Sequence, residues 1–178
     1  MSAMPQHESH MKHYRSTATY LRGAVGGLVG TVVMDLFGLV LFLALGGPAS
    51  LSVSIIGDAA AEFSARIGVF VEGGAPLGAL LHYLIGVALG IILSAAILRI
   101  ESLQALSTRR LTTLSVIYVE IMSLPMLATA AILLTMTSTQ TVQWFGISFV
   151  MHLVYGAVLG LVVSYGLRPA ATTRTRTI

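Results

Sequence analysis

Cysteine is absent from this chain, and charged residues make up only 10% of its 178 positions. The absence of cysteine excludes disulfides, thiolate metal sites and cysteine nucleophiles. About a quarter of the residues in a soluble domain are charged, so the shortage of charge argues against a water-soluble fold. Hydrophobic residues make up 56% of the sequence, and the mean hydropathy is +0.88. This composition predicts an integral membrane protein.

Four apolar segments are long enough to cross a bilayer, whose hydrocarbon core of about 30 Å requires about 20 helical residues. They cover residues 23–45, 77–98, 111–136 and 144–167. Their apolar runs are too continuous for a membrane barrel, and open strands cannot satisfy their backbone groups in lipid. We therefore predict an all-α protein with four transmembrane helices in one domain, residues 23–167. The first segment is longer than the apolar core of a secretory signal, about 7–15 residues, and is interpreted as a transmembrane helix.

Basic residues flank these segments unevenly. They precede the first segment, separate the second from the third and follow the fourth: Lys12, Arg15, Arg22, Arg99, Arg109, Arg110, Arg168, Arg174 and Arg176. The loop 46–76 carries Arg66 against three acids, and the loop 137–143 carries no charge. Because cytoplasmic loops carry the excess of positive charge, the tails 1–22 and 168–178 are both predicted to be cytoplasmic. We interpret the basic flanks as anchors to lipid headgroups, and we expect no nucleic-acid partner.

The loop 46–76 is predicted to contain an external amphipathic helix. Its apolar residues recur at approximately helical spacing between Pro48 and Gly73: Leu51, Ile55, Ile56, Phe63, Ile67 and Phe70. Such a helix lies in the membrane interface. It would act as a membrane anchor, which the sequence favours, or as a lid over the histidines of the neighbouring spans.

An internal repeat divides the chain into two halves. His82-Tyr-Leu-Ile-Gly86-Val-Ala-Leu-Gly90 recurs 70 residues later as His152-Leu-Val-Tyr-Gly156-Ala-Val-Leu-Gly160. In each half the preceding apolar segment carries one acid, Asp35 or Glu120. Both halves enter the membrane from the same side, so the repeat predicts two parallel, pseudo-symmetric helical hairpins related by an axis along the membrane normal.

The four ionisable groups of this repeat form the candidate site, because ionisable residues within a membrane are costly and usually functional. Helical rise places His82 and His152 about 24–26 Å from the cytoplasmic arginines, and Asp35 and Glu120 about 15–20 Å from them. We therefore expect the imidazoles to face each other at one level inside the bundle. The acids should lie one to two turns below, with water bridging the gap.

Glycine residues are predicted to set the helix packing around this site. Gly86 and Gly90 share a helix face with His82, as Gly156 and Gly160 do with His152. Small residues at this spacing let membrane helices approach closely, and Gly30 offers a similar surface on the first span. Three tyrosines are candidates for hydrogen bonds around the site: Tyr83, Tyr118 and Tyr155.

Three stretches carry a family resemblance: Gly30-Thr-Val-Val-Met-Asp35-Leu-Phe-Gly38, Leu81-His82-Tyr-Leu-Ile-Gly86 and His152-Leu-Val-Tyr-Gly156-Ala-Val-Leu-Gly160-Leu. They resemble families of bacterial inner-membrane proteins with four helices and domains of unknown function. The resemblance covers most of residues 23–167 and departs from the families at Glu120, where a less polar third helix is expected. It implies a four-helix protein of the bacterial inner membrane and implies no activity.

Three functions fit these observations. The first is a metal or proton site formed by His82, His152, Asp35 and Glu120, since imidazole and carboxylate suit divalent Zn, Fe or Mn and helical bundles host such sites. The second is a non-catalytic accessory or structural subunit of a larger membrane complex or homo-oligomer, in which polar groups only hold helices together.

The third is a b-type haem protein with His82 and His152 as axial ligands. Two features argue against haem: no arginine lies at the histidine level, and close glycine packing between the second and fourth spans would leave no room. No catalytic residue is assigned, and the sequence favours a protein that is not an enzyme. The N-terminal His7, His10 and His13 fit a copper or nickel chelator or, as we favour, a disordered polar terminus.

Overall fold

The computed structural model of the chain describes residues 6–167, with side-chain positions for residues 17–165. All regular structure in this part of the chain is helical: α1 (Gln6–Ala44), α2 (Leu51–Arg66), α3 (Ala75–Arg99), α4 (Glu101–Gln104), α5 (Thr108–Leu133) and α6 (Ser138–Leu167). The predicted all-α fold is therefore confirmed. The side chains of His7, His10 and His13 and the predicted tail 168–178 lie outside the described residues.

Four helices are long and apolar enough to cross a membrane, as the sequence predicts. They are residues Thr17–Ala44 of α1, all of α3 and α5, and residues Ser138–Tyr165 of α6. Large hydrophobic side chains on these helices are exposed, among them Val40 at 67%, Leu84 at 58% and Ile132 at 69%. Water-soluble proteins rarely expose large continuous apolar surfaces, whereas lipid covers them. These are the features of a multi-pass membrane protein.

Several helix ends differ from the predicted positions. Helix α1 begins at Gln6, whereas the predicted span begins at residue 23. The sequence favoured a disordered terminus before that span. Helix α5 ends at Leu133, before position 136, because Thr135 adopts a left-handed φ of 48° that interrupts a helix. Helix α6 begins at Ser138, before position 144. There the Thr137 hydroxyl accepts the Gln140 N–H, and the Gln140 side chain accepts the Thr137 N–H, which is a capping box.

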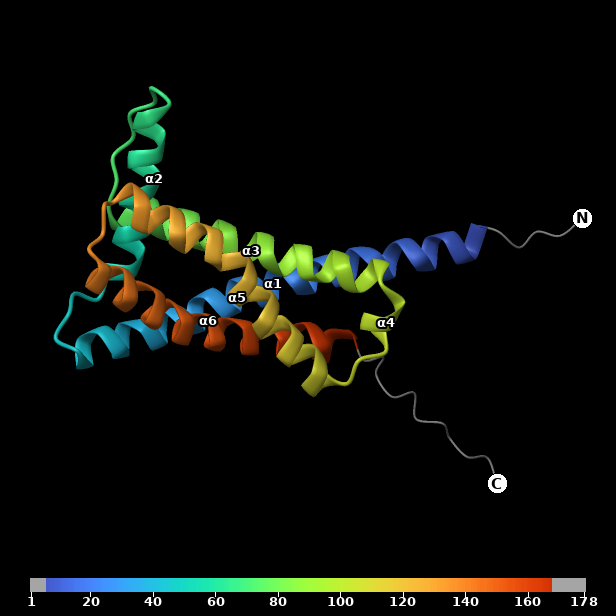
Figure 1. The fold of residues 1–178 in the computed structure, drawn as a ribbon. Coiled ribbons are helices and arrows are strands. Elements are labelled where there is room, and N and C mark those ends of the chain that lie inside the picture. The colour runs from blue at the N-terminus through green and yellow to red at the C-terminus, as the bar shows by residue number, and fades with distance from the viewer. Residues whose placement is uncertain (1–5, 168–178) are drawn as a thin grey trace, which may run out of the picture.

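The spans form two hairpins joined along one side. Helix α1 packs along α3, and α5 packs along α6, while the α1–α6 contact joins the two hairpins. Helices α3 and α5 make little direct contact. Helix α2 crosses one end of the bundle, and the short α4 lies at the other end (Figure 1). The bundle is therefore closed between α1 and α6 and loosely packed between α3 and α5.

Small residues allow the backbones within each hairpin to touch. In the first hairpin, a Cβ on Gly27 would meet the backbone of Gly86, and one on Gly86 would meet the hydroxyl of Thr31. In the second hairpin, a Cβ on Gly156 would lie 2.7 Å from the Cα of Val116. The glycine rows of α3 and α6 thus pack on α1 and α5. The expectation that they pack the second span on the fourth, which argued against haem, is wrong.

A helix, α2, forms in the loop for which the sequence predicts an external amphipathic helix, and it is fixed to the start of α3. Gly57 of α2 packs against the backbone of Gly74, and Gly78 of α3 packs against that of Val53. The carboxylate of Asp58 accepts the N–H of Gly74 at 2.7 Å. Phe63 remains 54% exposed. Helix α2 is therefore attached to the bundle, and its exposed side chains include charged Asp58 and Arg66 as well as apolar Phe63.

Helix α5 bends near its middle, as Figure 1 shows. Pro125 lies inside this helix and has no N–H for the carbonyl of Ile121. A missing hydrogen bond together with the clash of the proline ring is the usual cause of a kink. The bend lies one turn beyond Glu120 and changes the direction of the half of α5 that passes α2.

Candidate functional site

His82 and Asp35 form a pair within the first hairpin. Nδ1 of His82 on α3 lies 3.2 Å from Oδ1 of Asp35 on α1. The imidazole is almost fully buried, and the carboxylate is about three-quarters buried, with 10% and 25% of the side chains exposed. Nδ1 has no complete hydrogen bond, so the two groups meet at ion-pairing distance without hydrogen-bond geometry.

The second hairpin holds the corresponding pair. Nδ1 of His152 on α6 lies 3.9 Å from Oε2 of Glu120 on α5. Both Nδ1 of His152 and Oε1 of Glu120 are buried without a hydrogen-bond partner in the described part of the chain. The acids thus touch the histidines directly, whereas the sequence predicted a gap of one to two turns bridged by water. Tilted helices and the long glutamate side chain close that gap.

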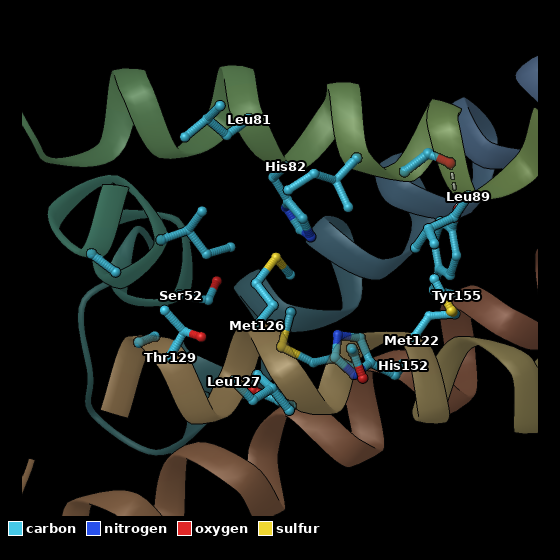
Figure 2. A pocket seen from close by; sticks show the side chains of 18 of the residues that line it. Ser52, Leu81, His82, Leu89, Met122, Met126, Leu127, Thr129, His152 and Tyr155 are labelled. Atoms are coloured by element: carbon cyan, nitrogen blue, oxygen red, sulfur yellow. Dashed lines mark hydrogen bonds between the residues drawn. The ribbon is translucent and has the colours of Figure 1, made fainter. Parts of the chain in front are cut away.

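Both histidines line one cavity of about 340 Å³ between α3, α5 and α6. Figure 2 shows His82 and His152 on different walls of this space, with Met126 of α5 reaching into it. Asp35 and Glu120 do not line the cavity. Each imidazole therefore lines the cavity and also lies beside a carboxylate that does not line it.

The cavity wall is mostly apolar. Its aliphatic, aromatic and thioether side chains include Leu81, Leu89, Met34, Met122, Met126, Leu127, Met151 and Trp144. Helix α2 adds Ile56 and Phe63 at the end of the cavity, so this helix covers part of the site. No lysine, arginine, aspartate or glutamate is among the lining residues that the structure describes.

Two tyrosines join the hairpins, and of these Tyr155 lines the cavity while Tyr118 does not. The hydroxyl of Tyr155 on α6 donates to the carbonyl of Gly86 on α3 at 2.6 Å (Figure 2). The hydroxyl of Tyr118 on α5 donates to the carbonyl of Leu89 on α3 at 3.1 Å. Both were candidate partners of the histidines and acids, but they bond to backbone instead. Only Tyr83 lies beside an acid, Asp35.

The described residues do not bring four ligands together. Nowhere in residues 6–167 do three or more His, Cys, Asp or Glu side chains form a group that could hold a metal ion. The four predicted site residues are instead divided into two pairs, one in each hairpin. Because a zinc site usually takes at least three protein ligands, this arrangement suits protons better than a divalent cation.

Several cavity residues were missed by sequence reasoning. Trp144 lies near the start of α6, where it is buried and donates from Nε1 to the carbonyl of Leu127 at 3.3 Å. Met126 and Ser52 gave no signal, since isolated methionines and serines are ordinary packing residues. Trp144 had one signal that was left unused: it is the only tryptophan in the chain.

Comparisons with known proteins add no family to this description. No protein-family model, no curated protein and no solved structure matches the chain.

Proposed function

We propose that this chain is a membrane protein whose two histidine–carboxylate pairs exchange protons with a cavity inside the membrane. One observation carries the proposal. His82 and His152 line the same cavity, and each lies beside a carboxylate of its own hairpin. Ionisable groups at membrane depth usually mark a functional path, and chains of His and acidic residues are the typical proton relays.

The chemistry of each pair suits proton exchange. A neutral imidazole carries one N–H and one acceptor nitrogen, and a carboxylic acid carries one proton between two oxygens. A proton that enters one ring nitrogen from the cavity can therefore be balanced by a proton that leaves the other nitrogen for the acid. His82 exchanges with Asp35, beside which Tyr83 lies, and His152 exchanges with Glu120.

Matched contacts support the proposal that the hairpins are pseudo-symmetric. The two histidine helices correspond at an offset of 70 residues, and Asp35 and Glu120 relate the other two helices at an offset of 85. Gly86 contacts Thr31 in the first hairpin, and the corresponding Gly156 contacts Val116 in the second. The acid–histidine contacts correspond in the same way. Two copies of one unit would therefore present two equivalent proton sites to a single cavity.

The proposal includes a position in the cell. The basic flanks support cytoplasmic termini, and the loop that contains α2 then faces the outside of a bacterial inner membrane. The resemblance to four-helix inner-membrane families agrees with this placement. In this proposed orientation, the end of the cavity that α2 covers lies near the outer surface of the membrane.

The test is ¹⁵N NMR of histidine-labelled protein in lipid nanodiscs across a range of pH. His82→Phe and His152→Phe assign the two signals. We expect both imidazoles to change protonation with pH. We also expect Asp35→Asn to alter the response of His82 and leave that of His152 nearly unchanged, while Glu120→Gln does the reverse. Imidazole signals that stay in one state throughout, in the wild type and in both acid variants, would show that the pairs are structural and that the accessory-subunit alternative is correct.

A further inference from the structure

The cavity has a mouth on the side of the bundle. Met122 and Thr129 of α5 and Phe63 of α2 line the cavity and are nevertheless exposed, with 45% of Met122 and 54% of Phe63 accessible. A residue that both lines a cavity and is exposed belongs to its rim. The rim therefore lies along α5 and beneath α2, where α3 and α5 make little contact.

The two helices on either side of this mouth expose apolar side chains along their length. Among them, Leu84 on α3 and Ile121 on α5 are 58% and 59% exposed. Both lie within the candidate membrane spans, so lipid chains would cover them. A molecule that enters between α3 and α5 therefore comes from the bilayer.

The wall of the cavity defines the polarity of its occupant. With no lysine or arginine among the described lining residues, a carboxylate or phosphate would have no permanent counter-charge. A volume of about 340 Å³ exceeds what a single ion requires and is in the lower range of ligand pockets. The occupant is thus a neutral organic molecule with an apolar body.

The two histidines define the polar groups of the occupant. They lie on different walls of the cavity and both belong to a proton-exchanging pair. When the acid holds the shared proton, the imidazole can donate its N–H to a carbonyl in the cavity. When the acid is ionised and accepts from Nδ1, the other ring nitrogen can accept from a hydroxyl. Each pair can therefore bind either a carbonyl or a hydroxyl.

We propose that the cavity binds the ring of a lipid-soluble quinone or quinol, with one ring oxygen at His82, the other at His152 and the apolar tail passing through the mouth into the bilayer. The proposal depends on the proton-exchanging pairs described above. Quinones present two carbonyls and quinols two hydroxyls at opposite sides of one ring, which matches two groups that can donate or accept. Thioethers such as that of Met126 make favourable contacts with aromatic rings such as that of the quinol.

Trp144 provides a direct readout of binding. It is the only tryptophan in the chain, and it lines the cavity. Quinones quench indole fluorescence at short range. Decylubiquinone added to the purified protein in phosphatidylcholine nanodiscs should therefore quench Trp144 with a saturable component, above the linear quenching that a lipid-dissolved quencher produces.

Variants test whether the histidines themselves bind the quinone. His82→Phe and His152→Phe should each raise the dissociation constant of the saturable component about tenfold, since each removes a buried hydrogen bond. Ser94→Ala and Ser164→Ala are the matched controls, because these serines are buried on the same two helices but do not line the cavity. They should leave the quenching curve unchanged. Decylbenzene, which has the same chain and no oxygen, should fail to displace the quinone.

Two results would overturn the quinone proposal. One is quenching of wild-type protein that stays linear with quinone concentration. The other is saturable quenching that decylbenzene or oleate reverses, which would show a general lipid cavity. Either result leaves the proton-exchange proposal standing if the imidazole signals still respond to Asp35→Asn and Glu120→Gln. Imidazole signals that do not respond would contradict that proposal independently.

Discussion

Single glycine residues set how closely the helices of each hairpin approach one another. Gly27 and Gly86 bring the backbones of α1 and α3 into contact one turn from Thr31, whose hydroxyl donates to the carbonyl of Gly27 at 2.9 Å. Without this approach, His82 would stand farther from Asp35. The histidine–acid distance therefore depends on residues that have no chemistry of their own.

Adding one methyl group at this contact should separate the helices. Gly27→Ala places a Cβ against the carbonyl of Gly86 and 3.0 Å from the Cα of Val87, both backbone atoms that cannot turn aside. We expect a loss of roughly 1–3 kcal/mol in stability, the usual cost of overpacking. The measurement is the thermal midpoint in detergent. Gly146→Ala is the matched control, because a Cβ there meets nothing within 4 Å. Equal midpoints for the two variants would contradict the close-packing account.

At the scale of elements, α5 and α2 shape the cavity. Pro125 bends α5, and residues on both sides of the bend, Met122 and Met126, line the cavity. Helix α2 covers the end of the cavity and is fixed there by Asp58. The sequence favoured a membrane anchor for this helix over a lid, whereas in the structure it also covers the histidine cavity.

Removing the proline should straighten α5. Pro125→Ala restores an N–H to the carbonyl of Ile121 and removes the ring clash. Because the chain has no cysteine, spin labels can be attached at Ile117→Cys and Ile132→Cys alone, both of which are exposed on α5. We expect the distance between these labels to increase in the Pro125→Ala background. Labels at Leu80→Cys and Ile92→Cys on α3 should keep their distance. An unchanged α5 distance would mean that packing, and not Pro125, bends the helix.

At the scale of the whole molecule, the two hairpins are joined asymmetrically. If they are copies related by an axis along the membrane normal, the contact between α1 and α6 should have an equivalent between α5 and α3. The first is tightly packed and the second is not. The cavity occupies the looser side, so the departure from symmetry creates the space that both histidines share.

The proposed topology can be tested with single cysteines. Phe70→Cys lies in the loop after α2, at a position that is 88% exposed, and Glu101→Cys lies in the exposed α4 at the other end of the bundle. In intact cells we expect a membrane-impermeant maleimide to label the first variant and not the second. Both should react after permeabilisation, which is the control. Labelling of Glu101→Cys in intact cells would invert the proposed orientation.

The sequence by itself determined the class of protein and the contents of its spans. Apolar length required four helices, because lipid offers no partner for an unpaired backbone group. The repeat assigned His82 and His152 to two of the helices and Asp35 and Glu120 to the others. Helical periodicity also predicted that the glycines would lie on the histidine faces.

The tertiary structure decided which groups meet. Periodicity fixes the face of a residue and its depth to about one turn, but the tilt and rotation of neighbouring helices decide distances of a few ångströms. Sequence reasoning therefore placed all four groups around one site, while the structure forms two direct pairs. The cavity could not be predicted, since it arises where α3 and α5 make little contact, where Pro125 bends α5, and where α2 covers one end.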